Sequence, residues 1–228
     1  MSFYRTMYKI FAPVVRLFYR MEIVGAENIP ENGCILASNH TAFDDVLILS
    51  AAARRQVRYM AKKELFRIPL LAQLITALGA YPVNRGGADV GSIKRTIRML
   101  EDGELIGIFP QGHRHGKTDP RTTEVKGGIG MIAYHTKSDV IPVFLDSRWG
   151  KTCIFRHNTV IFGKPIPYDS LGFVNGGVKE YQNTAEYIFR KVCTLKYGEP
   201  EEDAIAEDAA AEEKTDSHIE TAGKEHRS

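Results

Sequence analysis

A histidine followed by two acidic residues makes residues 38–45 the part of the chain best suited to chemistry. The segment reads Ser-Asn-His-Thr-Ala-Phe-Asp-Asp, so His40 is followed by one carboxylate at Asp44 and another at Asp45. A neutral histidine oriented by a carboxylate can remove the proton of a hydroxyl group. A single HxxxxD match also arises often by chance. We interpret His40 as a candidate general base whose support must come from other segments.

Helical spacing and helix capping favour different acids as the partner of His40. Residues four apart share a helix face, which points to Asp44. Thr41, however, is a suitable N-cap, and Asp44 would then occupy the third helical position of a capping box, where its charge suits the helix dipole. His40 would lie outside the helix, and Asp45 would point back to its ring. We therefore predict the pair His40–Asp45, with Asp44 as a structural cap.

Two arginines follow predicted strands and lie close to glycine residues. Arg85 follows the predicted strand 80–83, and Arg114 follows the predicted strand 105–109. Between that second strand and Arg114, Gly112 permits close approach of the backbone. A guanidinium just after the carboxyl end of a strand is well placed to hold a phosphate or a carboxylate. Arg85 taken alone would more often be a solvated turn residue.

Short apolar runs alternate with helical patterns along most of the chain. The predicted strands are Met21–Val24, Cys34–Ala37, Val57–Met60, Ala80–Val83, Leu105–Phe109, Val140–Leu145 and Thr159–Phe162. Continuous apolar runs are typical of strands covered on both faces. The clearest helical patterns are Asp89–Glu101 and Val178–Leu195. This alternation predicts an α/β fold with a mainly parallel sheet flanked by helices.

The N-terminal segment combines large apolar side chains with regularly spaced basic ones. The basic residues follow one another at intervals of four, seven and four positions, which keeps them near one helical face: Arg5, Lys9, Arg16 and Arg20. No uninterrupted apolar run approaches the ~20 residues that span a bilayer. A basic amphipathic helix rich in aromatics is typical of the membrane interface, so we predict that residues 1–20 dock on a membrane. A surface helix packed on the body is the alternative.

Composition and charge separate a basic body from an acidic tail. The 228 residues are 43% hydrophobic and 25% charged, as in ordinary globular proteins. Residues 199–228 carry eleven acidic and three basic side chains without apolar periodicity, so we expect a disordered tail outside the α/β domain, 21–198. The other 198 residues hold 27 basic and 17 acidic side chains, a net charge of +10. This favours anionic partners: phosphorylated substrates, an anionic membrane surface or nucleic acid.

Cysteine and histidine spacing gives no indication of a disulfide framework or a metal site. Cys34, Cys153 and Cys193 form no CxxC pair, which fits a reducing compartment. His113 and His115 lie two residues apart, but no third ligand lies at a suitable spacing. We therefore predict that the protein holds no metal. The N-terminus lacks the pattern of a signal peptide.

Four motifs in sequence order resemble the glycerolipid acyltransferase family, in particular the bacterial 1-acyl-sn-glycerol-3-phosphate acyltransferases. NHxxxxD matches Asn39, His40 and Asp45; a glycine-x-x-aromatic-x-x-arginine motif matches Gly79, Tyr81 and Arg85; FPEGTR matches Phe109, Pro110, Gly112 and Arg114; and an apolar run with proline matches Ile141, Pro142 and Val143. The resemblance covers about residues 20–165. It departs at Gln111, where the family usually has Glu, and at His113, where it usually has Thr.

The resemblance implies an enzyme without a cofactor at the cytoplasmic side of the cell membrane. It would move a fatty acyl group from acyl-CoA or acyl-carrier protein to the sn-2 hydroxyl of lysophosphatidic acid, giving phosphatidic acid. His40 would act as base and Asp45 would orient it. The acceptor phosphate would lie in a pocket formed by Arg85, Gln111, Gly112 and Arg114. Backbone amides near Gly112 are candidate donors to the oxyanion.

Some alternatives remain open at this point. Gln111 keeps the hydrogen bonding of Glu without its charge, which leaves room for another lysophospholipid or an amino-acid-derived lipid as acceptor. A non-catalytic membrane-binding protein would explain the basic helix. We expect no nucleic-acid partner, because no recognition motif accompanies the basic charge. The crowded apolar segment Leu65–Ala80 is by default a buried core helix, but it could also wall an acyl-chain groove or enter lipid.

Overall fold

The computed structural model describes residues 3–83 and 90–199. The chain divides into a compact unit, Met1–Lys196, and a second unit, Tyr197–Ser228. Nearly all of the predicted tail, 199–228, lies outside the described residues, and so does Arg85.

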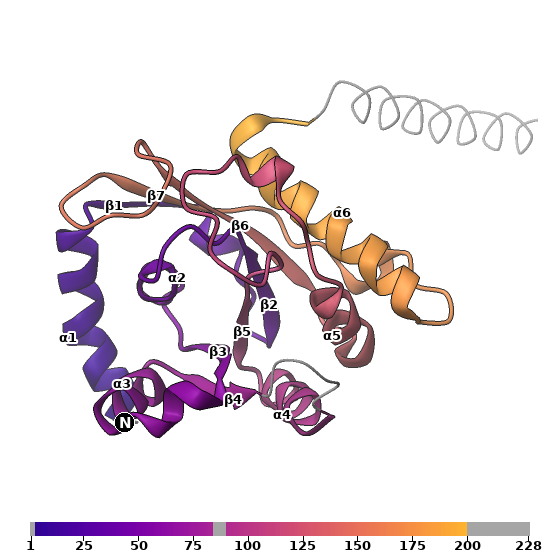
Figure 1. Cartoon of the computed structure of the whole chain (residues 1–228), viewed down its shortest axis with the longest axis horizontal. Coiled ribbons are helices and arrows are strands. Elements are labelled where there is room, and N and C mark those ends of the chain that lie inside the picture. The colour runs from indigo at the N-terminus through magenta and orange to yellow at the C-terminus, as the bar shows by residue number, and fades with distance from the viewer. Residues whose placement is uncertain (1–2, 84–89, 200–228) are drawn as a thin grey trace, which may run out of the picture. The chain divides into compact units, whose positions relative to one another are not determined.

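Within the described residues, seven strands form one sheet (Figure 1). They are β1 Met21–Val24, β2 Cys34–Ser38, β3 Val57–Lys62, β4 Ala80–Val83, β5 Leu105–Ile108, β6 Val140–Ser147 and β7 Asn158–Phe162. Their order is β1-β7-β6-β2-β5-β3-β4, and every neighbouring pair is parallel except β6 with β7. The predicted α/β fold with a mainly parallel sheet is confirmed.

Helices cover both faces of the sheet (Figure 1). They are α1 Phe3–Phe18, α2 Asp45–Ala52, α3 Pro69–Ala77, α4 Val90–Glu101, α5 Gly128–Thr136 and α6 Val178–Tyr197. The central strand β2 shows why its sequence is apolar throughout. Ile35 and Ala37 pack in the core shared with α5 and α6, whereas Cys34 and Leu36 pack in the core shared with α2. Successive strand residues point to opposite faces, so both sets are buried.

Helix α1 is fastened to the end of α2 by its polar side chains as well as by apolar packing. Ala12 and Val15 pack on Ala51. The guanidinium of Arg16 donates to the carbonyl of Ala51 from Nε at 3.0 Å and from Nη2 at 2.6 Å, and the hydroxyl of Tyr8 donates to the same oxygen at 2.9 Å. The last carbonyls of a helix lack partners within the helix, which favours a cation there.

This attachment turns one of the predicted basic residues of α1 toward the body of the protein. We predicted a common basic face for the helix, but Arg16 turns toward α2 while the outer side carries exposed apolar residues. Those residues are Phe11, Val14, Leu17 and Phe18. No helix in the described part of the chain is both long and apolar enough to cross a bilayer. Helix α1 is therefore packed on the body and presents an apolar outer surface.

The crowded segment Leu65–Ala80 does not form the buried core helix that we took as the default. It divides into a 3₁₀ helix, Lys63–Arg67, and α3, because Pro69 begins a new helix. None of the residues of α3 is buried, and Leu70 is 82% exposed. Because α3 packs on the edge strand β4, only one of its sides is covered. A role as a groove wall or in lipid contact stays a prediction.

Candidate active site

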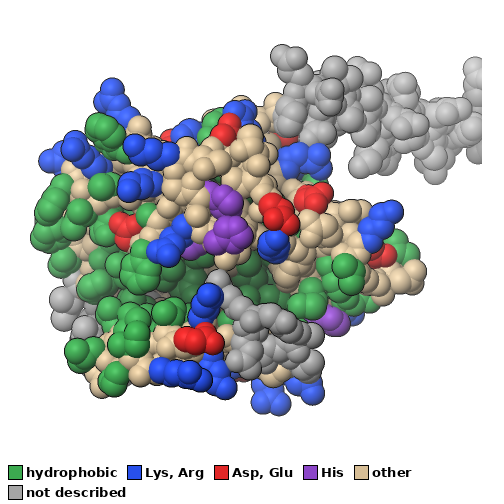
Figure 2. All heavy atoms as spheres, in the orientation of Figure 1, with side chains coloured by type: hydrophobic (Ala, Val, Ile, Leu, Met, Phe, Trp, Pro, Cys, Tyr) green, Lys and Arg blue, Asp and Glu red, His purple; other side chains and the backbone are tan. Residues whose placement is uncertain are grey.

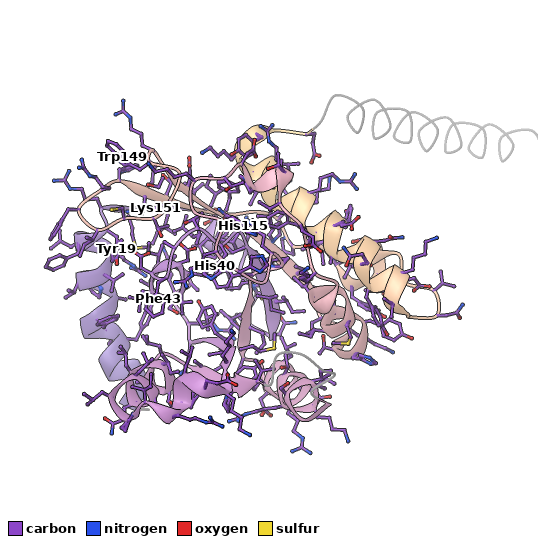
Figure 3. The ribbon with its side chains drawn as sticks, viewed as in Figure 1. Tyr19, His40, Phe43, His115, Trp149 and Lys151 are labelled. Carbon is purple, nitrogen blue, oxygen red and sulfur yellow. The ribbon has the colours of Figure 1, made fainter. Side chains whose placement is uncertain are left out.

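Three parallel strands deliver the chemical residues to one edge of the sheet. β2 lies between β5 and β6, and all three run in the same direction. Their carboxyl ends continue into the loops that carry His40, Arg114 and Thr152. Ligands of open parallel sheets bind at this edge, where connections leave to both sides of a central strand. Figure 3 shows His40 and His115 together at this place, and the backbone N–H of His115 donates to the carbonyl of His40 at 3.0 Å.

The structure brings the predicted pair His40 and Asp45 into contact. Nδ1 of His40 lies 2.9 Å from Oδ2 of Asp45. A carboxylate can only accept, so Nδ1 carries the proton and Nε2 is left as an acceptor. The side chain of His40 is 17% exposed, whereas that of Asp45 is fully buried. A substrate hydroxyl can therefore reach the ring but not the carboxylate behind it. The ring of Phe109 stacks on the imidazole, with the two centroids 4.1 Å apart.

Asp45 organises the turn that precedes α2. Its Oδ2 accepts the backbone N–H of Thr41 at 2.5 Å and that of Ala42 at 2.9 Å. Its Oδ1 accepts the hydroxyl of Thr41 at 3.1 Å and lies 2.6 Å from the hydroxyl of Thr152. The carboxylate is thus held by backbone and side-chain donors on both oxygens. Rotation that would release His40 would break several charge-assisted hydrogen bonds at once.

The predicted capping box is wrong. Helix α2 begins at Asp45, so Asp44 occupies the N-cap position, and its side chain makes no capping hydrogen bond. Asp44 instead lies 3.0 Å from the hydroxyl of Thr152 and accepts a hydrogen bond from Tyr19. Burial, followed by this contact with Asp44, raises the pKa of Tyr19 above its ordinary value. The later helix start leaves Thr41 in the turn, where it binds Asp45.

Asn39 connects the site to the neighbouring strand β6. Its side-chain amide donates to the carbonyl of Leu145 at 3.0 Å and accepts the N–H of Leu145 at 2.7 Å. Asn39 is almost fully buried. The amide group extends the hydrogen bonding between β2 and β6 by one position, so the chain leaves the sheet at His40 in a defined direction.

Gln111 has a different role from the one that we predicted. Its Oε1 accepts the backbone N–H of His40 at 2.7 Å, and its Nε2 donates to Oγ1 of Thr123 at 2.7 Å. The hydroxyl of Thr123 donates to the carbonyl of Pro120, so it is arranged to accept from an amide. Gln111 is 1% exposed. Gln111 therefore positions the backbone of His40 from inside the protein, and it does not line a pocket for the acceptor phosphate.

The predicted anion-binding residues meet different outcomes. Gly112 adopts a left-handed backbone with φ of 75°, and its N–H donates to the carbonyl of Phe109 at 3.0 Å. It lines a pocket beside Phe109, and the backbone amides near it stay predicted oxyanion donors. Arg114 is exposed, and its guanidinium lies 5.9 Å from the centre of the Phe43 ring. The placement of Arg85 is outside the described residues, so its role stays a prediction.

Two neighbouring histidines border the site on the loop after β5. The rings of His113 and His115 have centroids 4.9 Å apart. Burial is the main cause that lowers the pKa of His115 below its ordinary value, with further contributions from the charges of His113 and His40. The lowered pKa favours the neutral ring of His115, and the exposed guanidinium of Arg114 lies beside it in the sequence.

An apolar pocket of about 190 Å³ opens beside Phe109. Its lining comes from five elements and the loop after β5, and includes Met60, Val83, Ile93, Ile108, Ile129 and Met131. Figure 2 shows histidine side chains next to a hollow with hydrophobic lining on this face. Phe109 both borders the pocket and stacks on His40, so a chain bound in the pocket would end near the imidazole.

Sequence reasoning missed Thr152 entirely and gave Asn39 no function. Thr152 lies 107 residues from Asp45 along the chain, in the loop between β6 and β7, and no local pattern distinguishes it. The pocket was missed for the same reason, since its lining residues are apolar and widely separated. For Asn39 a signal was available, because it is a polar residue of the NHxxxxD motif that directly follows a buried strand.

The role of Gln111 can be tested through stability. Gln111→Leu keeps much of the volume but removes both hydrogen bonds, so we expect the free energy of unfolding to fall by about 1–3 kcal/mol. The measurement is urea denaturation. Gln73→Leu, an exposed position on α3, is the control and should change stability little. Equal stability of Gln111→Leu and the wild type would contradict the role.

Comparisons with known proteins agree with these features. A family model described as Acyltransferase matches residues 20–146. The chain is 30% identical over 168 residues to the 1-acyl-sn-glycerol-3-phosphate acyltransferase of Bacillus subtilis, covering 70% of this chain and 82% of that protein. It is 31% identical over 170 residues to the protein of that name from Streptococcus pneumoniae, covering 72% of this chain and 62% of that protein.

A solved structure supports the fold. The crystal structure of the 1-acyl-sn-glycerophosphate (LPA) acyltransferase PlsC from Thermotoga maritima matches with a TM-score of 0.59 and 23% identity, covering 86% of this chain and 84% of that one. The part of this chain that the family model matches, residues 20–146, includes the NHxxxxD motif and the loop with Arg114. This chain belongs to the acyltransferase family.

Proposed function

We propose that the protein transfers a fatty acyl group from acyl-CoA or acyl-carrier protein to the sn-2 hydroxyl of 1-acyl-sn-glycerol-3-phosphate, giving phosphatidic acid. The contact between Nδ1 of His40 and the buried carboxylate of Asp45 carries this proposal. The names of the two bacterial relatives support the acceptor. We infer no cofactor, because the reaction needs only a base and a carbonyl made reactive by the thioester.

The base acts through the free nitrogen of His40. Nε2 takes the proton of the acceptor hydroxyl while the hydroxyl oxygen attacks the carbonyl carbon of the thioester. The negatively charged carboxylate of Asp45 stabilises the imidazolium that forms. When the tetrahedral intermediate collapses, the C–S bond breaks and the thiolate takes the proton from Nε2. Every atom is thus accounted for by one imidazole and the two substrates.

Substrate binding follows from the surroundings of the imidazole. The pocket beside Phe109 is apolar and suits part of the acyl chain. On the solvent side, Arg114 is an exposed cation that can bind the acceptor phosphate, with Arg85 as a second candidate from the sequence. The Gln111 departure no longer favours a different acceptor, because that side chain is buried under His40.

We place the protein peripherally on the cytoplasmic side of the cell membrane. The outward apolar side of α1, with Leu17 75% exposed, supports attachment to a bilayer surface. Lys9 and Arg20 are exposed at the ends of this surface and suit anionic headgroups. The acceptor is itself a membrane lipid, so attachment would concentrate the enzyme where its substrate lies.

His40→Ala tests the reaction directly. Purified protein is incubated with lysophosphatidic acid and labelled acyl-CoA or acyl-carrier protein, and the lipid product is identified by mass. Loss of the base should lower kcat by about 10²–10⁴-fold while the fold is retained. His157→Ala, an exposed histidine paired with Glu22, is the control. Substantial turnover by His40→Ala, or wild-type transfer to another lipid only, would contradict the proposal.

Thr152→Val tests the support of the carboxylate. Valine keeps the shape but cannot donate a hydrogen bond to Asp45, so the orientation of His40 should loosen. We expect kcat to fall about tenfold, as for the loss of one charge-assisted hydrogen bond. The acceptor KM should stay unchanged. Thr136→Val also removes the hydrogen bond of a half-buried hydroxyl, in α5, and should leave kcat intact. A changed KM with normal kcat would contradict the positioning role.

Arg114→Ala tests the phosphate site. Removing this guanidinium should raise the KM for lysophosphatidic acid about tenfold and leave the donor KM unchanged, since the cation contacts the acceptor alone. Steady-state kinetics with each substrate varied in turn gives both values. Arg190→Ala on α6 provides the charge-matched control. An unchanged acceptor KM would remove Arg114 from the site.

A further inference from the structure

The loop between β6 and β7 exposes three large apolar side chains. Trp149 is 52% exposed, Ile154 is 45% exposed and Phe155 is 60% exposed. Trp149 is the one tryptophan of the chain. Contiguous exposed apolar surface marks a site of interaction. Figure 3 shows Trp149 at the outer end of the molecule, away from the packed centre of the sheet.

The same loop is basic. Arg148, Lys151 and Arg156 are exposed, and residues 147–157 contain no acidic side chain. The guanidinium of Arg156 lies 5.0 Å from the centre of the Trp149 ring. Tryptophan and cations side by side are typical of the zone between headgroups and acyl chains, where the ring is partly buried and the cation binds anionic lipid.

The loop continues the apolar outer side of α1. The rings of Phe155 and Phe18 have centroids 5.5 Å apart, and the N–H of Phe155 donates to the carbonyl of Phe18 at 2.7 Å. Leu17, next to Phe18, is among the exposed apolar residues. In Figure 2, Lys and Arg side chains surround hydrophobic ones at the upper left, where Figure 1 places the loop and the end of α1.

We propose that the β6–β7 loop, residues 148–156, is a second membrane-contact element that enters the interface of an anionic bilayer next to α1. This rests on the proposed function and deepens it. Thr152 in the middle of the loop contacts Asp45, so the segment that touches lipid also holds the catalytic carboxylate. The acceptor would reach His40 from a surface to which the loop is already bound.

A bilayer suits this surface better than an acidic protein does. An acidic partner such as a carrier protein would be matched by the cations alone. The exposed tryptophan, isoleucine and phenylalanine, joined to the apolar side of α1, give a surface that needs an apolar medium as well as negative charge. Anionic lipid provides both at the same depth.

The sole tryptophan makes the wild-type protein its own reporter. Trp149 fluorescence is recorded while vesicles of phosphatidylcholine, with or without phosphatidylglycerol, are added to the full chain. We expect a blue shift, protection from acrylamide and quenching by lipids brominated near the headgroup, all stronger with phosphatidylglycerol. If the protein sediments with vesicles while Trp149 stays fully open to acrylamide, α1 docks without the loop and the inference is wrong.

A matched pair of variants tests the energetic contribution. Ile154→Ser with Phe155→Asn removes two exposed apolar side chains, and Asn tolerates the φ of 60° at position 155. Vesicle affinity measured by sedimentation should fall about tenfold or more. Val174→Ser, at an apolar position that is 80% exposed in another loop, should bind as the wild type does. Unchanged vesicle binding of the double variant would overturn the inference.

These readouts separate the inference from the proposed function. Fluorescence and sedimentation need no turnover, so a protein without transfer activity that still shows the Trp149 shift would support the loop's role alone. An active enzyme without the shift would overturn the loop's role alone. A double variant that loses binding to acyl-carrier protein but keeps vesicle binding would show a protein-binding surface and would also overturn the inference.

Discussion

The buried carboxylate of Asp45 is the group on which the site depends. A carboxylate removed from water is costly unless donors replace its hydration, and this one receives them from the imidazole, two backbone N–H groups and the hydroxyls of Thr41 and Thr152. The requirement fixes the turn before α2 and the loop after β6 together. The orientation of His40 follows from it, because Nδ1 is committed to Asp45 and Nε2 is left as the acceptor.

The sheet makes this arrangement possible at little cost in conformational freedom. Three adjacent parallel strands end at one edge, so residues from three distant segments need only short loops to meet. Side-chain amides complete the alignment: Asn39 pairs with Leu145 across β2 and β6, and Gln111 holds the backbone of His40. His40 is thus presented by rigid strands, while Arg114 and Trp149 lie on exposed loops.

The elements around His40 and Asp45 also form the apolar outer surface of the protein. Helix α1 is held by hydrogen bonds to the end of α2, the helix that Asp45 begins, and its apolar side faces outward. Tyr19, just beyond α1, binds Asp44, and Thr152 lies within hydrogen-bonding distance of both acids. The elements that present apolar surface are therefore the same elements that support the contact between His40 and Asp45.

The sequence by itself determined the strands, the parallel α/β class and the His40–Asp45 contact, because these follow from short-range periodicity and from spacing within one turn. Only the tertiary structure decided the functions of side chains whose partners are far along the chain. Gln111 binds His40, Arg16 caps α2, α3 stays uncovered, and Thr152 reaches Asp45. A polar or apolar residue type specifies what kind of partner a side chain needs, but the packing of remote segments decides which partner it meets.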